Sequence, residues 1–110
     1  MGRAGAGNLA GMELAEVLAI LRAHEAELRA RGVESLSVFG SVARGEAGPE
    51  SDVDLAARLA PDAKMTSVDF HGVREFISRT LRSEIDLIAE PIAFRPSLQR
   101  EVEADRAVAF

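Results

Sequence analysis

The chain has 110 residues, a mass of 11.8 kDa and a net charge of −5 from 13 basic and 18 acidic residues. Its length fits one domain, and 47% hydrophobic with 28% charged residues excludes a disordered or collagen-like chain. The acidic balance and the lack of Trp and Tyr disfavour binding to long nucleic acids or to an anionic membrane. The absence of cysteine excludes disulfides, thiolate zinc sites and cysteine nucleophiles.

No segment reaches the ~20 apolar residues that a membrane helix needs, so we expect a soluble, cytoplasmic protein. Residues 1–11 are rich in Gly and Ala and are predicted to form a flexible tail. Residues 12–110 are predicted to form a single domain.

In the first half of the chain, apolar residues at helical spacing predict a helix over 12–31 that Gly32 ends. Polar and apolar side chains alternate over residues 33–40, which predicts a strand. Ser41, directly after it, is a suitable N-cap for a short helical turn. A loop is expected at 45–49, and strict alternation predicts a second strand over 51–59.

In the second half, Thr66 and Asp69 resemble the capping box of a helix that reaches Leu81. A strand is expected over 84–89, and Pro96 suits the first turn of a helix that runs to about residue 104. The last four residues are expected to form a short strand or an ordered tail. This order predicts an α/β (α+β) fold in which helices flank one small mixed sheet.

The residues that indicate chemistry lie in the sequence FGSVARGEAGPESDVDL at 39–55. Gly40 allows close backbone approach, exposed amides at the following helix start favour a phosphate, and Ser41 adds a hydroxyl donor. Asp52 and Asp54 are two residues apart on a predicted strand, so their carboxylates share one face, about 6–7 Å apart. Mg²⁺ is usually held between such carboxylates and substrate phosphate oxygens.

A third carboxylate is expected to complete the site. Transfer at a nucleotide α-phosphate develops charge on the attacking and leaving oxygens, and two metal ions about 3.5–4 Å apart can hold both. Asp86 is the best candidate for the third ligand because it is a polar residue in the middle of an apolar strand.

This pattern closely resembles the DNA polymerase β-type nucleotidyltransferases, and within them the minimal nucleotidyltransferase (MNT) subgroup. The shared signature is a hydrophobic residue, Gly40-Ser41, ten intervening residues and Asp52-x-Asp54, and the family's later carboxylate matches Asp86. The resemblance implies a nucleotidyltransferase fold, ATP as substrate, and two Mg²⁺ ions held by Asp52, Asp54 and Asp86.

The resemblance also implies a partner protein. MNT proteins commonly pair with a helical HEPN ribonuclease toxin and, as antitoxins, neutralise it by transferring AMP to one of its tyrosines. This chain contains no tyrosine, so such an acceptor would lie on another chain. Two alternatives stay open, namely a non-catalytic antitoxin that acts by binding alone and nucleotidyl transfer to a small molecule.

The other candidate residues also have structural interpretations. Arg44 could pair with phosphate oxygens or equally with Glu46 on the surface. Ser51 is a candidate nucleotide-binding residue, although a turn that orients Asp52 is the simpler interpretation. Asp52 and Asp54 could be an exposed strand face, and His24 and His71 are expected at the surface or at an interface.

Overall fold

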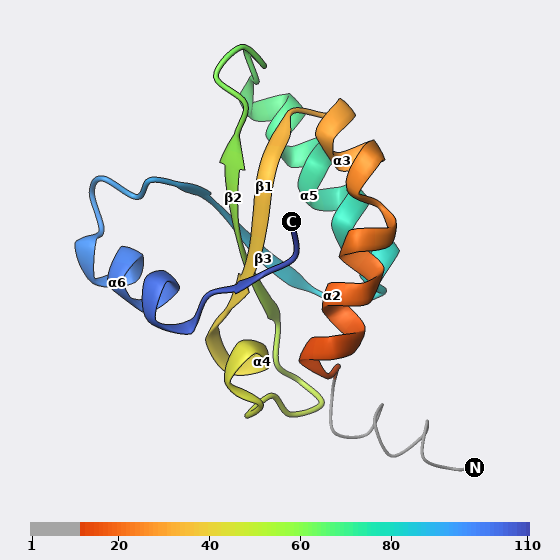
Figure 1. The fold of residues 1–110 in the computed structure, drawn as a ribbon, viewed down its shortest axis with the longest axis vertical. Helices are drawn as coiled ribbons and strands as arrows, with labels where there is room; N and C mark the ends of the chain where they lie inside the picture. The colour runs from red at the N-terminus through yellow and green to blue at the C-terminus, as the bar shows by residue number, and fades with distance from the viewer. Residues whose placement is uncertain (1–11) are drawn as a thin grey trace.

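The computed structural model describes residues 12–110 and confirms the predicted fold class. The predicted tail at 1–11 lies outside the described residues. A four-stranded mixed sheet has the strand order β3-β2-β1-β4, with β2 and β3 parallel and the other neighbours antiparallel (Figure 1). The strands are β1 (Val33–Phe39), β2 (Val53–Leu59), β3 (Ile85–Glu90) and β4 (Ala107–Val108). The helices are α2 (Leu14–Ala23), α3 (Glu25–Ala30), α4 (Gly40–Arg44), α5 (Ser67–Leu81) and α6 (Pro96–Asp105).

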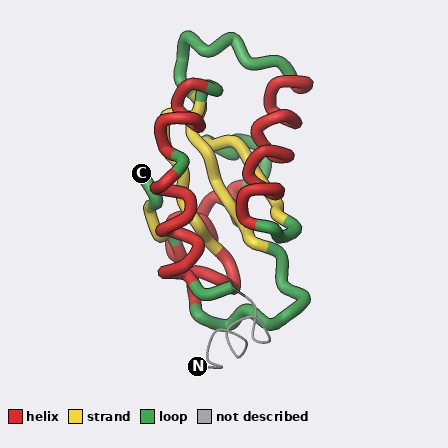
Figure 2. The backbone as a smooth tube through the Cα atoms, turned by 90° about the vertical axis from the view of Figure 1, so that its right-hand side faces the viewer, coloured by secondary structure: helices red, strands yellow, loops and turns green. Residues whose placement is uncertain are grey.

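The helices cover the two faces of the sheet unequally. α2, α3 and α5 lie across one face, where Figure 2 shows α2–α3 and α5 side by side. The main core forms there, with fully buried side chains that include Leu21, Leu36, Leu55 and Ile77. α6 lies on the other face over a smaller cluster that includes Phe39, Ala56 and Val102. The sheet is therefore buried on both faces near its centre, while its ends are left for polar groups.

Three predicted helix boundaries are confirmed by their local chemistry. The Thr66 hydroxyl accepts from the Asp69 amide at 3.1 Å, and the Asp69 carboxylate accepts from the Thr66 amide at 3.0 Å, which completes a capping box. Gly32, at φ +101°, ends the first helical region as expected. Pro96 opens α6, and β4 forms near the C-terminus.

The predicted single helix over 12–31 is wrong, because it breaks at His24. The His24 amide donates to Leu21, three residues back, while its ring Nδ1 lies 2.9 Å from the Ile20 carbonyl that a continuous helix would bond to that amide. The ring also meets Phe76 edge-on, with the centroids 5.9 Å apart. His24 is thus a half-buried joint between α2 and α3, whereas His71 is exposed as expected.

Within residues 12–110, no helix is both long and apolar enough to span a membrane.

Candidate active site

Two of the predicted carboxylates lie side by side at one end of the sheet. Asp54 on β2 and Asp86 on β3 are register partners in the parallel pair, so their side chains leave the same face of strands spaced about 4.8 Å apart. Asp54 is half-buried and Asp86 is exposed. This face is the one that α6 covers farther along, because Asp54 alternates with Ala56 of the smaller cluster.

Asp52 has a different setting from the predicted one. β2 begins at Val53 rather than at residue 51, so Asp52 belongs to the preceding loop and strand alternation does not fix its direction. Its side chain is exposed. Asp52 is nevertheless close enough to raise the pKa of the Asp54 carboxyl through its charge.

Gly40 brings the end of β1 directly against Asp54. Phe39 is the register partner of Asp54, and the next residue, Gly40, turns the chain into α4 with φ +74°. A Cβ atom built on Gly40 would lie 3.0 Å from the Asp54 Cγ and closer still to Oδ2. Both the backbone conformation and the contact therefore require glycine at this position.

The charge around Asp54 is predominantly negative. Burial raises the pKa of the Asp54 carboxyl above its ordinary value of 3.8, and the charges of Asp86, Glu101 and Asp52 raise it further, while Arg44 lowers it. An arrangement of like charges around a partly buried carboxylate is costly without a cation. The electrostatics of this end of the sheet therefore suit a bound cation.

The chemistry of the donors fits Mg²⁺ that arrives with a phosphate-bearing substrate. Among residues 12–110, no group of three or more His, Asp or Glu side chains is gathered closely enough to bind a metal ion by itself. Mg²⁺ is commonly held by only one or two carboxylates, with substrate phosphates and waters as the remaining ligands. Asp54 and Asp86 provide such a pair, and Asp52 lies nearby.

Arg44 forms the surface ion pair with Glu46 that was one of its two predicted roles. Its Nε donates to Glu46 at 2.9 Å, and its Nη1 donates to Asp105 of α6 at 2.7 Å. Its Nη2 has no acceptor among residues 12–110. The same guanidinium can thus be held by two carboxylates and still offer a donor edge.

Ser41 and Ser51 are both placed by backbone contacts. The prediction that Ser41 is an N-cap is wrong, because α4 starts at Gly40, two residues earlier than that cap implies, and Phe39 takes the N-cap position. Ser51 closes the predicted turn, since its Oγ accepts from the Gly48 amide at 2.9 Å. Their predicted role in nucleotide binding stays a prediction.

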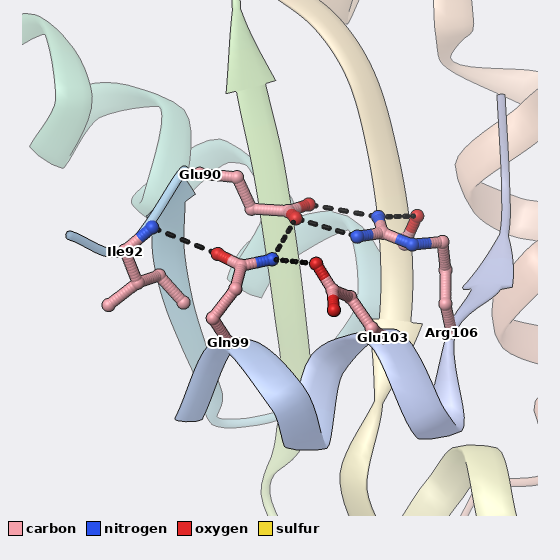
Figure 3. Close-up of polar contacts among 6 residues, drawn as sticks. Glu90, Ile92, Gln99, Glu103 and Arg106 are labelled. Carbon is pink, nitrogen blue, oxygen red and sulfur yellow. Dashed lines mark hydrogen bonds and ion pairs between the residues drawn. The ribbon is translucent and has the colours of Figure 1, made fainter. Parts of the chain in front are cut away.

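A buried polar network that the sequence analysis missed fixes α6 on the sheet (Figure 3). The Glu90 carboxylate is 1% exposed and accepts two hydrogen bonds from Arg106, at 2.6 and 2.9 Å, and one from Gln99 at 3.0 Å. Arg106 also donates to the Ser37 hydroxyl on β1. The predicted strand over 84–89 omitted Glu90, which is the last residue of β3 and is buried beneath α6.

This network places two more acids near the site. α6 carries Glu101, which acts on Asp54 through its charge, and Asp105, which holds Arg44. Their four-residue spacing puts them on one side of the helix. The sequence signal was an acid directly before Pro91, at the end of a largely apolar strand, with Arg106 as its distant partner.

Comparisons with known proteins place this chain in a family. The nucleotidyltransferase domain family matches residues 21–109. The chain is 37% identical to the protein adenylyltransferase MntA of Thermococcus cleftensis over 81 residues, which cover 73% of this chain and 80% of that protein. A minimal nucleotidyltransferase of known structure superposes with a TM-score of 0.72 and 28% identity, covering 88% of this chain and 96% of that one.

A more distant structure has the same fold. A chain from the complex of the tri-AMPylated Shewanella oneidensis HEPN toxin with an MNT antitoxin matches with a TM-score of 0.60 and 17% identity, covering 84% of this chain and 71% of that one. The domain family, together with relatives that are protein adenylyltransferases, defines this chain as a nucleotidyl-transferring enzyme. The chain belongs to the nucleotidyltransferase domain family, as the sequence motif predicted.

Proposed function

We propose that this chain transfers AMP from ATP, in an Mg²⁺-dependent reaction, to a tyrosine hydroxyl of a HEPN-domain partner and thereby acts as an antitoxin. The observation that carries the proposal is the register pair Asp54–Asp86 with Gly40 packed against it. The protein adenylyltransferase MntA, at 37% identity, supports a protein acceptor and AMP as the group transferred.

Each site residue has a chemical task in this reaction. The acceptor oxygen attacks the α-phosphorus of ATP, the bond to the β-phosphate oxygen breaks, and pyrophosphate leaves. Asp52 and Asp54 would hold Mg²⁺, which when bound neutralises charge on the phosphate oxygens. Asp86, the more exposed member of the pair, would take the proton of the hydroxyl or help to bind the metal.

The turn after β1 would position the triphosphate. Gly40 lets the backbone approach, and Ser41 offers a hydroxyl at the start of α4. Ser51 would orient the loop that carries Asp52, since it closes the turn with Gly48. The donor edge left on Arg44 would bind a phosphate oxygen.

The proposal is tested by the intact mass of the partner. The HEPN-domain protein of the same genome is incubated with this chain, ATP and Mg²⁺ and then weighed by mass spectrometry. We expect a gain of one or more AMP units that Asp54→Asn abolishes, whereas the matched Asp62→Asn, in an exposed turn, keeps it.

Neutralisation of the partner without any mass gain, retained by the double variant Asp52→Asn/Asp54→Asn, would contradict transfer and favour an antitoxin that acts by binding alone.

A further inference from the structure

An apolar groove lies beside β3 on the described part of the chain. The groove has a volume of about 480 Å³ and runs between the start of α5 and the segment that leads from β3 to α6. None of the predicted site residues lines it. The apolar residues that line it include Phe70, Leu87, Ile88, Ala89, Phe94 and Leu98.

The groove follows a free strand edge. β3 is the outer strand of the sheet and pairs only with β2 among residues 12–110. Such an edge presents backbone N–H and C=O groups to which an extended segment of another chain can add as a further strand. Leu87, Ile88 and Ala89 of this strand line the groove, so the edge and the apolar surface coincide.

The rim of the groove indicates the chemistry of its occupant. Phe94 is 85% exposed, the most exposed of the large hydrophobic side chains in the described residues. The neighbouring Arg95 is the one charged residue that lines the groove, and its side chain makes no ion pair or hydrogen bond within residues 12–110. An apolar segment with a carboxylate opposite Arg95 is complementary to this surface.

The groove shares strand β3 with the candidate active site. Asp86 and Ile88 are two residues apart on β3, so they share a face and lie about 7 Å apart along the strand. An extended segment in the groove would therefore carry its next residues past Asp86. A side-chain hydroxyl on that segment would meet the carboxylates at the other end of the strand.

We propose that this groove docks the acceptor protein, through an extended apolar segment that adds to the edge of β3 and sets a carboxylate against Arg95. The inference rests on the proposed function, because it names the surface on which the modified partner lies. A protein acceptor needs such a surface, since the paired carboxylates at the sheet end provide little apolar area for contact.

Binding without ATP tests the docking surface separately from transfer. The affinity of the HEPN-domain protein is measured by calorimetry for wild type, Phe94→Ser, Arg95→Glu and the control Val108→Ala, a half-exposed residue on the opposite sheet edge. We expect each groove variant to weaken binding by about tenfold or more. The control should stay within about twofold of wild type.

A second measurement separates the two proposals. Asp54→Asn should bind the HEPN-domain protein as wild type does, so a failure of AMP transfer leaves the docking result intact. Wild-type affinity in both groove variants, or no binding by the wild type, would overturn the docking proposal. A weaker affinity for ATP in Phe94→Ser, with unchanged protein binding, would assign the groove to the nucleoside and overturn it as well.

Discussion

At the scale of single residues, the contact between Gly40 and Asp54 connects the backbone turn to the chemistry. Gly40 is the first residue of α4, directly after β1, and Asp54 lies on the neighbouring strand β2, so a side chain at position 40 would collide with the carboxylate. Gly45, at the end of α4, has the same φ of +74°, but a Cβ atom added there would meet nothing within 4 Å. Comparing an alanine substitution at each of the two glycines therefore separates the effect of the contact with Asp54 from that of backbone strain.

We predict that Gly40→Ala loses activity and about 2–3 kcal/mol of stability, because strain adds to the collision with Asp54. Gly45→Ala should cost only about 1 kcal/mol and keep activity. Urea unfolding and the AMP-transfer assay measure both variants. Equal losses of activity in the two variants would show that the contact with Asp54 is unimportant.

Asp54 itself is expected to destabilise the metal-free protein. Because burial and the neighbouring acids raise the pKa of this carboxyl, its ionised form is less favourable in the folded state than in the unfolded state at pH 7. We predict that Asp54→Asn melts at a higher temperature than wild type in EDTA. A lower melting temperature for Asp54→Asn would contradict this, and Asp62→Asn serves as the exposed control.

At the scale of elements, α6 connects the site to the sheet. The ion pair between Glu90 and Arg106 joins the end of β3 to the end of α6. Asp105, on the same helix, accepts a hydrogen bond from Arg44 of α4. The bidentate hydrogen bonds from Arg106 hold the pKa of the Glu90 carboxyl below its ordinary value of 4.5. A carboxyl whose pKa is lowered on folding stabilises the fold at pH values above its ordinary pKa. This stabilisation is lost as the pH falls through the pKa of the folded state.

We predict that Glu90→Gln lowers the free energy of unfolding by about 3 kcal/mol at pH 7, because it breaks a buried ion pair and leaves Arg106 uncompensated. The difference from wild type should narrow below pH 4.5, where the wild-type carboxyl is protonated first in the unfolded state and, at lower pH, in the folded state. The control Glu27→Gln, in an exposed i,i+4 pair with Arg31, should cost less than about 0.5 kcal/mol. A difference that stays constant between pH 7 and acid conditions would contradict the assignment.

The sequence predicted those elements whose signals are local. The Thr66–Asp69 capping box, the start of α6 at Pro96 and the alternation around Val53 and Leu55 each depend on neighbours in the chain. The register of Asp54 with Asp86 is not local, and the family resemblance predicted only that both residues belong to one site. The break at His24 and the burial of Glu90 depend on Phe76 and Arg106, far along the chain, and no local pattern indicates which distant residue each one contacts.

At the scale of the whole molecule, the net charge of −5 has a specific distribution. Three of the acidic charges belong to Asp52, Asp54 and Asp86, which leaves −2 for the rest of the chain. An acidic protein repels long nucleic acids, yet a nucleotide whose phosphates arrive with Mg²⁺ brings the positive charge that this end of the sheet requires. The acidity is therefore concentrated partly where the reaction is proposed to occur.

The position of the transferred phosphorus tests the central claim most directly. The HEPN-domain partner is incubated with this chain, Mg²⁺ and ATP radiolabelled at either the α- or the γ-phosphorus. We predict that the partner retains the α label and not the γ label, and that Asp54→Asn removes the signal while Asp62→Asn keeps it. Retention of the γ label, or α labelling that is unchanged in Asp54→Asn, would contradict nucleotidyl transfer by this site.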